Sequence, residues 1–176
     1  GPDGRIVIGG AFSTVQGLTR SCIARLEANG TLDSTFDPGA GAQGMAPLVG
    51  AGPFVNTLCV TDDGQVVIGG SFAQFDGVAR HSIARLDADG GLDALFDGAG
   101  GTDNEITSCD QRGDGRILIG GLFFDFAGRA GLVQLMPDGA ADPTFYPAVH
   151  TNSVLAVKAP EDDRCMVGGS FRTVAS

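Results

Sequence analysis

Short apolar runs recur along the chain, and each is followed directly by two glycines and preceded by an acidic turn. The four runs are Ile6-Val7-Ile8, Val66-Val67-Ile68, Ile117-Leu118-Ile119 and Cys165-Met166-Val167, and the glycine pairs begin at Gly9, Gly69, Gly120 and Gly168. Successive side chains of a strand point to opposite faces, so three apolar residues in a row predict a strand that is buried on both faces. The glycine pair that follows permits a bulge or a close backbone approach.

The match between units continues downstream of each glycine pair. Ile23-Ala24-Arg25-Leu26 in the first unit corresponds to Ile83-Ala84-Arg85-Leu86 in the second, and Phe36 corresponds to Phe96 at the same offset. The third unit carries Leu132-Val133-Gln134-Leu135 and is two residues shorter before this stretch. Agreement over this length identifies a tandem repeat.

Each unit is predicted to hold four short strands. The first covers Thr57 to Val60, with counterparts at Ile106 to Cys109 and at Val154 to Val157. The second is the apolar run, the third is the Ile-Ala-Arg-Leu stretch, and the fourth lies around Leu-Asp-x-x-Phe. Asp-Gly and Asn-Gly steps between the strands favour hairpin turns, because glycine accepts a positive φ.

The spacing of the glycine pairs sets the domain organisation. The pairs lie 60, 51 and 48 residues apart, and the longer first interval contains a Gly- and Ala-rich insertion over residues 39–53. A period near 50 residues is typical of β-propeller blades. We therefore expect one all-β segment over residues 1–176, a β-propeller of four-stranded antiparallel blades. Its units are residues 3–53, 54–103, 104–151 and 152–176, three full-to-partial blades and a truncated fourth.

Composition supports a folded all-β chain. Of 176 residues, 43% are hydrophobic and only 18% are charged, which favours folding over disorder. Glycine supplies 29 residues, as many short strands with tight turns require. No apolar run approaches the ~20 residues of a membrane span, so we expect no membrane insertion.

The charge balance excludes one class of partner. The formal net charge is −10, and no lysine and arginine stripe offsets it. A phosphate backbone is repelled by such a surface, so nucleic acid is not an expected partner.

The repeat resembles the delta-60 repeat, a bacterial β-propeller repeat. The family pattern runs roughly Asp-Gly-Lys-Ile-Leu-Val-Gly-Gly-x-Phe, then Gly-x-x-Arg, then Ile-Ala-Arg-Leu-x-x-Asp-Gly-x-Leu-Asp-x-x-Phe. Asp63 to Phe96 carries it almost intact. Asp3 to Phe36 matches nearly as well, whereas the third unit has Ala141 where the second has Leu92. The resemblance implies a propeller within a bacterial secreted or cell-surface protein, and it implies no catalytic residues.

Three and a half units are fewer than the ~4–8 blades of a typical ring. The first strand of unit one and the last two strands of unit four have no counterpart in the sequence. We favour a fragment of a longer ring, with the remaining blades as partner. A ring shared by two copies is the second interpretation, and closure with unusual geometry is the third.

Calcium is the one metal ion for which the sequence offers candidate ligands. Asp87, Asp89 and Asp93 surround Gly90 at positions one, three and seven, which partly resembles an acidic oxygen-ligand loop. The favoured interpretation is an Asp-Gly hairpin turn with a side-chain-to-backbone turn at Asp93, without any cofactor.

The cysteines are Cys22, Cys59, Cys109 and Cys165, without the C-x-x-C spacing of zinc sites. Cys59 and Cys109 hold nearly equivalent places on successive first strands. A disulfide between them is one interpretation, and apolar core thiols are the favoured one.

Two other residue types invite a chemical interpretation. His81 and His150 have neither a nucleophile motif nor a two-histidine metal spacing, so surface positions are expected. Arg20, Arg25, Arg80 and Arg85 recur with the repeat and are expected to form structural pairs with aspartates such as Asp33 and Asp93.

The predicted function is a non-catalytic scaffold or protein-interaction module, with the 39–53 insertion as its most distinctive surface. A glycan- or small-ligand-binding propeller is the alternative, weakened because Tyr146 is the only tyrosine and tryptophan is absent. A hydrolase or lyase in a central channel is more remote, since the first strands supply little beyond Glu105 and Asp110.

Overall fold

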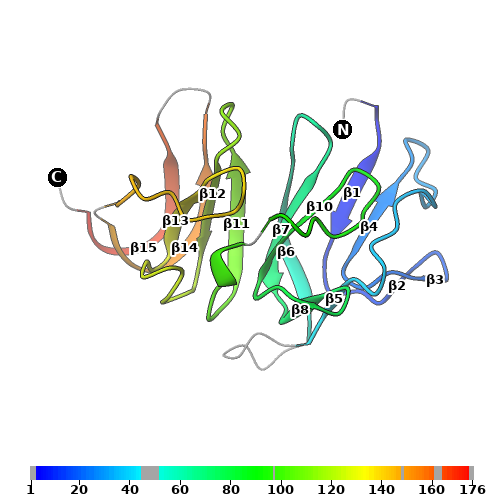
Figure 1. The fold of residues 1–176 in the computed structure, drawn as a ribbon, viewed down its shortest axis with the longest axis horizontal. Helices are drawn as coiled ribbons and strands as arrows, with labels where there is room; N and C mark the ends of the chain where they lie inside the picture. Colours follow the sequence, from blue (N-terminus) through cyan, green and yellow to red (C-terminus); the bar gives the residue numbers. More distant parts are fainter. Residues whose placement is uncertain (1–2, 45–51, 97, 148, 161–163, 175–176) are drawn as a thin grey trace.

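The chain forms four small antiparallel sheets, which we call blades, arranged one after another in an arc (Figure 1). The computed structural model describes residues 3–44, 52–96, 98–147, 149–160 and 164–174. The blade strands are β1 (Ile6–Gly9) and β4 (Ile23–Leu26); β6 (Phe54–Val60), β7 (Val66–Ser71) and β10 (Ile83–Leu86); β11 (Ile106–Gln111), β12 (Ile117–Gly121) and β13 (Leu132–Leu135); and β14 (Val149–Lys158) and β15 (Met166–Val174). In the part of the chain that the structure describes, no helix is long and apolar enough to cross a membrane.

Short elements connect these strands. They are β2 (Thr14–Val15) and β3 (Leu18–Thr19), which pair with each other; β5 (Ala42–Gln43), β8 (Gln74–Phe75) and β9 (Val78–Ala79), which form a second small sheet; and the 3₁₀ turn η1 (Gly98–Gly100). Of the predicted insertion, residues 45–51 lie outside the described residues. Its first part is anchored on the second blade, because β5 pairs with β8 and the Ala40 N–H donates to Asp76 Oδ1 at 2.8 Å.

The register of the first and second strands repeats between blades. In the second blade Leu58 lies opposite Ile68, and the register shifts between Val55 and Thr57, opposite the glycine pair. The third blade shows the same shift between Ile106 and Ser108. The glycine pair therefore coincides with a bulge in the neighbouring strand, as the sequence predicts.

The three apolar residues before each glycine pair divide their contacts between two neighbouring blades. Val66 and Ile68 pack into a cluster with first-blade residues, whereas Val67, between them, packs into a cluster with third-blade residues. The third blade repeats this, since Ile117 and Ile119 face the second blade and Leu118 faces the fourth. The prediction of a strand buried on both faces is confirmed for β7 and β12, whereas β1 and β15 each have one exposed face, at Ile6 and at Met166.

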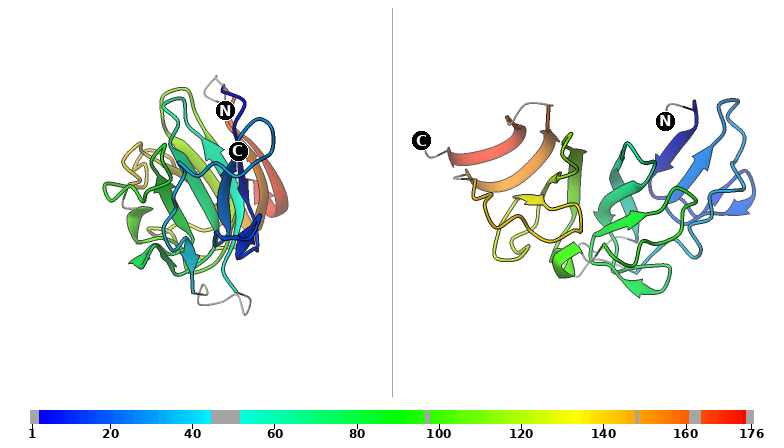
Figure 2. Two further views of the ribbon diagram at one scale, coloured as in Figure 1. Left: turned by 90° about the vertical axis from the view of Figure 1, so that its right-hand side faces the viewer. Right: turned by 45° about the horizontal axis from the view of Figure 1, so that its top comes forward.

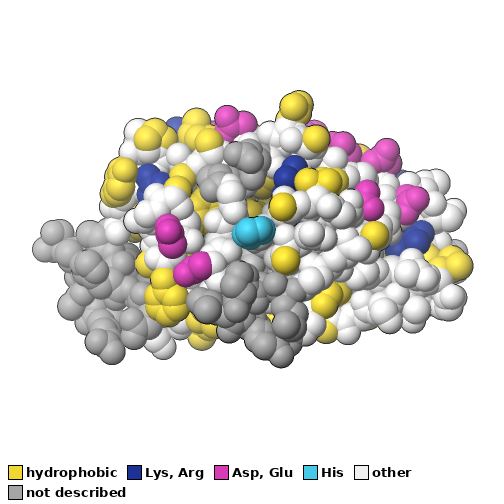
Figure 3. Space-filling model, turned by 60° about the horizontal axis from the view of Figure 1, so that its bottom comes forward, with side chains coloured by type: hydrophobic (Ala, Val, Ile, Leu, Met, Phe, Trp, Pro, Cys, Tyr) yellow, Lys and Arg dark blue, Asp and Glu magenta, His cyan; other side chains and the backbone are white. Residues whose placement is uncertain are grey.

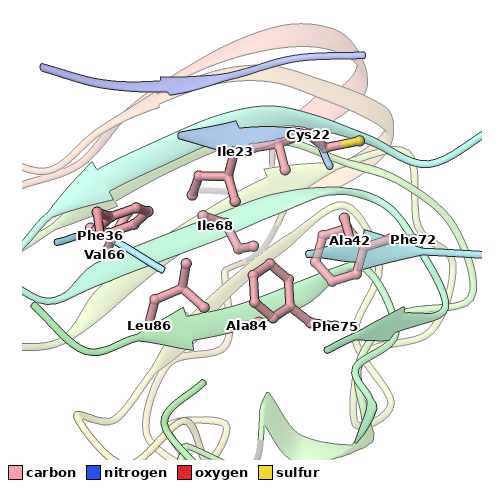
Figure 4. Close-up of a cluster of buried hydrophobic side chains, with 11 residues drawn as sticks. Cys22, Ile23, Phe36, Ala42, Val66, Ile68, Phe72, Phe75, Ala84 and Leu86 are labelled. Atoms are coloured by element: carbon pink, nitrogen blue, oxygen red, sulfur yellow. The ribbon is translucent and has the colours of Figure 1, made fainter. Parts of the chain in front are cut away.

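The core accordingly consists of three clusters, one at each junction between blades. Figure 4 shows the first, in which Ile23 and Phe36 of the first blade meet Ile68, Phe72 and Leu86 of the second. Burial of these apolar side chains supplies the main stabilising free energy, at about 25 cal/mol per Å² removed from water. Each blade therefore depends on its neighbours to bury its apolar faces, and backbone hydrogen bonds such as that from the Val55 N–H to the Gly10 carbonyl, at 3.2 Å, also join the blades.

The predicted four-stranded blade is not what the structure shows. The second and third blades are three-stranded sheets, and the expected fourth strand is reduced to isolated bridges such as Leu86 to Leu92. The pairing stops after Leu92 because the next residue, Asp93, accepts the Leu95 N–H with its side-chain Oδ1 at 2.8 Å. This side-chain turn takes the backbone out of the ladder directly after the bridge.

The arc does not close into a ring. β1 lies at one end and β15 at the other, with their sheets well separated in Figure 1 and in the right-hand view of Figure 2. Each end blade therefore has one face that no other described blade covers, and these two faces are the main departure from the internal repeat.

Candidate functional site: the open face of the last blade

Each junction between blades is built around a glycine that receives an aliphatic side chain from the next blade. A methyl group on Gly9 would lie 2.7 Å from Val55 Cγ1, and one on Gly120 would lie 2.4 Å from Val154 Cγ1. Gly69 meets Ile106 in the same way, at 2.5 Å. Distances this short leave no room for a Cβ, so close approach of the blades requires glycine at these positions.

Hydroxyl groups on the first strands align the blades. Thr57 Oγ1 accepts the backbone N–H of Cys109 at 3.0 Å, and Ser108 Oγ accepts that of Val157 at 3.0 Å. One residue earlier, Asn56 Nδ2 donates to the Ile106 carbonyl at 3.2 Å, and Thr107 Oγ1 donates to the Val154 carbonyl at 2.6 Å. These hydrogen bonds give partners to backbone groups that would otherwise be buried at the junction without one.

The last blade has a face that corresponds to the surface with which each inner blade packs on the next one, and no other described blade covers it. Met166 corresponds to the buried Val67 and Leu118 but is 59% exposed. A methyl group on Gly168 would meet only its own sheet, at 3.8 Å from Ala156 Cβ. Leu155 and Ala156 replace the residues that hydrogen bond across the inner junctions, and Leu155 is also 59% exposed. We call Leu155, Ala156, Met166 and Gly168 the terminal face.

The first blade is open on the opposite side. Ile6 corresponds to Val66 and Ile117, which pack against the preceding blade, but Ile6 itself is 52% exposed. The two open surfaces are therefore the two complementary sides of a blade junction. Exposed apolar surface of this kind marks interaction sites more often than catalytic ones.

The prediction that the recurring arginines pair with aspartates is confirmed for Arg25 and Arg85 but not for Arg20 and Arg80. Arg25 Nε donates to Asp33 Oδ2 at 2.7 Å, and Arg85 Nε donates to Asp93 Oδ2 at 2.8 Å. Each guanidinium also reaches the next blade, Arg25 at the Ala88 carbonyl and Arg85 at the Pro137 carbonyl, both at 2.5 Å. Arg20 and Arg80 instead donate to their own neighbouring carbonyls, those of Thr19 and Ala79.

The aspartates of these pairs have lowered pKa values. Burial opposes ionisation of Asp33, but the Thr35 hydroxyl and Arg25 outweigh it and lower its pKa to about 2. In the third blade the Thr144 hydroxyl and N–H, with Gln134, lower the pKa of Asp142 to about 2. Gln134 stands where the first and second blades have Arg25 and Arg85, and its Nε2 donates to Asp142 Oδ2 at 2.8 Å. These perturbed carboxylates belong to the framework of each blade.

The three candidate calcium ligands have separate hydrogen-bond partners. Asp87 Oδ1 accepts from Gln65 Nε2 at 3.0 Å, Asp89 Oδ1 accepts the Gly91 N–H at 3.1 Å, and Asp93 is paired with Arg85. Within the described ranges, no group of three or more His, Cys, Asp or Glu side chains is arranged to hold a metal ion. This geometry lends calcium binding no support.

The histidines lie apart from each other. His81 is exposed, and its carbonyl accepts the Thr102 N–H at 2.9 Å. It borders a cavity of about 460 Å³ that Asp103 and Asp125 also line. His150 lies within β14, with its backbone opposite Thr173.

The first strands place three dissimilar residues side by side, a grouping that sequence reasoning missed. Cys59, Asp110 and Lys158 all precede the first glycine of their unit by ten residues and line one cavity of about 340 Å³. Lys158 Nζ lies 2.9 Å from Asp110 Oδ2. The shared offset is the signal in the sequence, but the three residue types differ, so no recurring residue marks the grouping. Glu105 does not join them; its carbonyl accepts the Leu122 N–H at 3.0 Å.

Two further cavities repeat with the blades. One of about 310 Å³ is lined by Arg25 and Ala88, and one of about 270 Å³ by the equivalent Arg85 and Pro137. Their recurrence marks them as features of the junction itself. On the face in Figure 3 acidic side chains lie scattered and basic ones are few, without a basic stripe.

In this chain antiparallel sheets stack face to face one after another, and at each junction a glycine leaves room for an aliphatic side chain of the next sheet. Radially repeated small sheets of this kind are the architecture of β-propeller repeats. The chain belongs to the family described as a domain of unknown function (DUF5122) beta-propeller, which matches residues 1–36, 61–96 and 112–145 and so more than half of the chain. The matched segments cover the Gly-Gly strands of the first three blades, the Arg–Asp pairs and the buried Phe36 and Phe96. Neither a curated protein nor a solved structure matches the chain.

Proposed function

We propose that the chain is a non-catalytic β-propeller repeat module that acts as a scaffold and interaction domain. The observation that carries this proposal is the terminal face, which repeats the surface of an inner junction without a blade on it. The repeated polar residues support the same conclusion, because their charges are used within and between blades. The resemblance to delta-60 repeats favours a bacterial secreted or cell-surface protein as the setting.

The occupant of the terminal face in this proposal is the first blade of a second copy. Among the described blades, the first is the one whose other side is open, with Ile6 at its surface. A contact between the first blade of one copy and the last of another joins different surfaces, so it is heterologous. Such contacts close into a ring when the rotation permits, which would let two arcs share one propeller.

Sedimentation equilibrium tests this association. The wild-type chain should form concentration-dependent dimers or longer assemblies. Met166→Asp and Ile6→Asp should each weaken association by at least ~10-fold, because each places a charge in an apolar contact. Leu95→Asp is the matched control, since Leu95 is 85% exposed away from both faces and its change should leave association unaltered.

Mixing the two variants distinguishes this arrangement from a symmetric one. Each variant keeps one intact surface, so Ile6→Asp and Met166→Asp chains should form a pair together through the two unaltered surfaces. A chain that stays monomeric at all concentrations, or a Met166→Asp variant that associates normally, would contradict the proposal.

A glycan-binding function is the second candidate, favoured by one exposed aromatic. Phe124 is 63% exposed, and its N–H donates to Asp103 Oδ1 at 2.9 Å, beside the cavity that His81 borders. Tyr146 is 73% exposed, but the Arg129 guanidinium stacks on its ring with its central carbon 4.5 Å from the centroid. Binding on a glycan array that Phe124→Ala abolishes and Tyr146→Ala preserves would support this function.

A further inference from the structure

Two thiols meet across the junction between the second and third blades. Thr57 and Cys59 are two residues apart on β6 and so share one face of the strand. Thr57 Oγ1 accepts the Cys109 N–H at 3.0 Å and lies 3.4 Å from Cys109 Sγ, which fixes Cys109 against this face. Cys59 packs against the cluster that contains Cys109. Both are free thiols in this structure.

The two thiols differ in access to solvent. Cys109 is buried, whereas Cys59 is partly exposed and lines the cavity of about 340 Å³ that it shares with Asp110 and Lys158. A small reagent in this cavity can therefore reach Cys59 first. The other cysteines are placed differently, since buried Cys22 lies 3.0 Å from the Pro53 carbonyl and Cys165 packs against the cluster between the third and fourth blades.

The pair also differs in acidity. The hydrogen bond from the Cys59 thiol lowers the pKa of Cys109, and the Thr57 hydroxyl adds to this effect against the cost of burial. The same hydrogen bond, together with burial, raises the pKa of Cys59. Once Cys59 has formed a mixed disulfide it has no proton left to donate, and the Thr57 hydroxyl then remains to favour the Cys109 thiolate that resolves it.

We propose that Cys59 and Cys109 form a reversible disulfide that links the second blade to the third. With a small disulfide such as oxidised glutathione, Cys59 first gives up its proton, its sulfur then bonds to one glutathione sulfur, and the other glutathione takes up the proton and leaves as a thiol. The Cys109 thiolate then attacks Cys59 sulfur, and the second glutathione leaves. Two protein S–H groups are oxidised, one disulfide is reduced, and both protons end on the glutathione thiols.

Thiol–disulfide exchange on the intact chain tests the proposal. After incubation with oxidised glutathione, the free thiols titrated in denaturant should fall from four to two, and the mass should fall by ~2 Da. Peptide mapping should recover Cys59 joined to Cys109. The link closes a loop of about 50 residues, so it should raise Tm by about 5 °C or more, reversed by dithiothreitol.

Matched variants separate this site from general oxidation. A Cys22→Ser and Cys165→Ser double variant should keep the 2 Da loss and the Tm shift. Cys109→Ser should instead accumulate one glutathione adduct at Cys59. If the wild-type chain stops at a glutathione adduct on Cys59, links a different cysteine pair or retains all four thiols, the proposal is wrong.

Discussion

Gly69 and Ile106 touch across the junction between the second and third blades, so closely that a methyl group on the glycine would lie 2.5 Å from Ile106 Cγ2. The same contact joins Gly120 to Val154. Because aliphatic carbons cannot approach to this distance, a side chain at either glycine must push the blades apart. The Gly-Gly signature is therefore a requirement of stacking between sheets.

Gly69→Ala should destabilise the chain by about 1–3 kcal/mol, as overpacking of a close-packed junction typically does. Gly168→Ala is the matched control, because it makes the same change at the equivalent residue of the last blade, where the nearest atom is Ala156 Cβ at 3.8 Å. Urea unfolding at neutral pH measures both. Equal losses in the two variants would show that the glycines serve the strand conformation and not the junction.

The links from Arg85 to Asp93 and to the Pro137 carbonyl provide the second prediction. Arg85→Gln can keep the pairing with the aspartate, as Gln134 does with Asp142, but it loses the bond to Pro137 and the stacking on Phe96 at 4.8 Å. We expect a loss of about 1–2 kcal/mol in the free energy of unfolding. Arg80→Gln, whose guanidinium bonds to the adjacent Ala79 carbonyl, should cost less than about 0.5 kcal/mol. A larger loss for Arg80→Gln than for Arg85→Gln would contradict this assignment.

The sequence predicted the parts of the fold that depend on local repetition. The apolar run around Val67, the glycine pair after it and the Asp-Gly turns were enough to place the three strands of the second and third blades. The fourth strand was not predictable in this way, because Leu92 and Asp93 have strand-like neighbours while the Asp93 side chain diverts the backbone. The residue types around Leu92 predict a strand, but the hydrogen bond from the Leu95 N–H to the Asp93 side chain turns the backbone away from the sheet.

The candidate site was less predictable because it depends on neighbours in space. Met166 belongs to the same repeat position as Val67 and Leu118, and no local signal distinguishes an exposed copy from a buried one. The adjacency of Cys59 and Cys109 was open to prediction, since both lie on first strands of successive blades. Whether their side chains face each other depends on the angle between the blades, which the repeat does not specify.

Calcium should leave the stability of the chain unchanged. Asp93 is held by Arg85 and by the Leu95 N–H, and Asp87 and Asp89 bond to separate partners, so binding would have to displace these contacts. We expect Tm in millimolar calcium to agree with Tm in a chelator within about 1 °C. A rise of several degrees that Asp87→Ala abolishes would overturn this expectation.

Acid should destabilise the chain through the paired aspartates. The pKa values of Asp33 and Asp142 are lowered to about 2, whereas an unfolded aspartate titrates near ~3.9. A lowered native pKa means that the stabilisation is present above the unfolded value and is lost as pH falls through the native one. Each carboxylate should therefore contribute about 2 kcal/mol at neutral pH, lost between about pH 5 and pH 2.

Urea unfolding as a function of pH checks this dependence. The Asp33→Asn and Asp142→Asn double variant should be less stable than wild type at neutral pH but nearly equal to it at about pH 2, because protonation removes the same interactions from the wild type. Asp62→Asn, at an exposed turn, is the control and should retain the wild-type profile. If the double variant shows the same fall in stability with acid as the wild-type chain, the acid sensitivity must originate in other carboxylates, and the two blade aspartates would not be the groups that couple folding to pH.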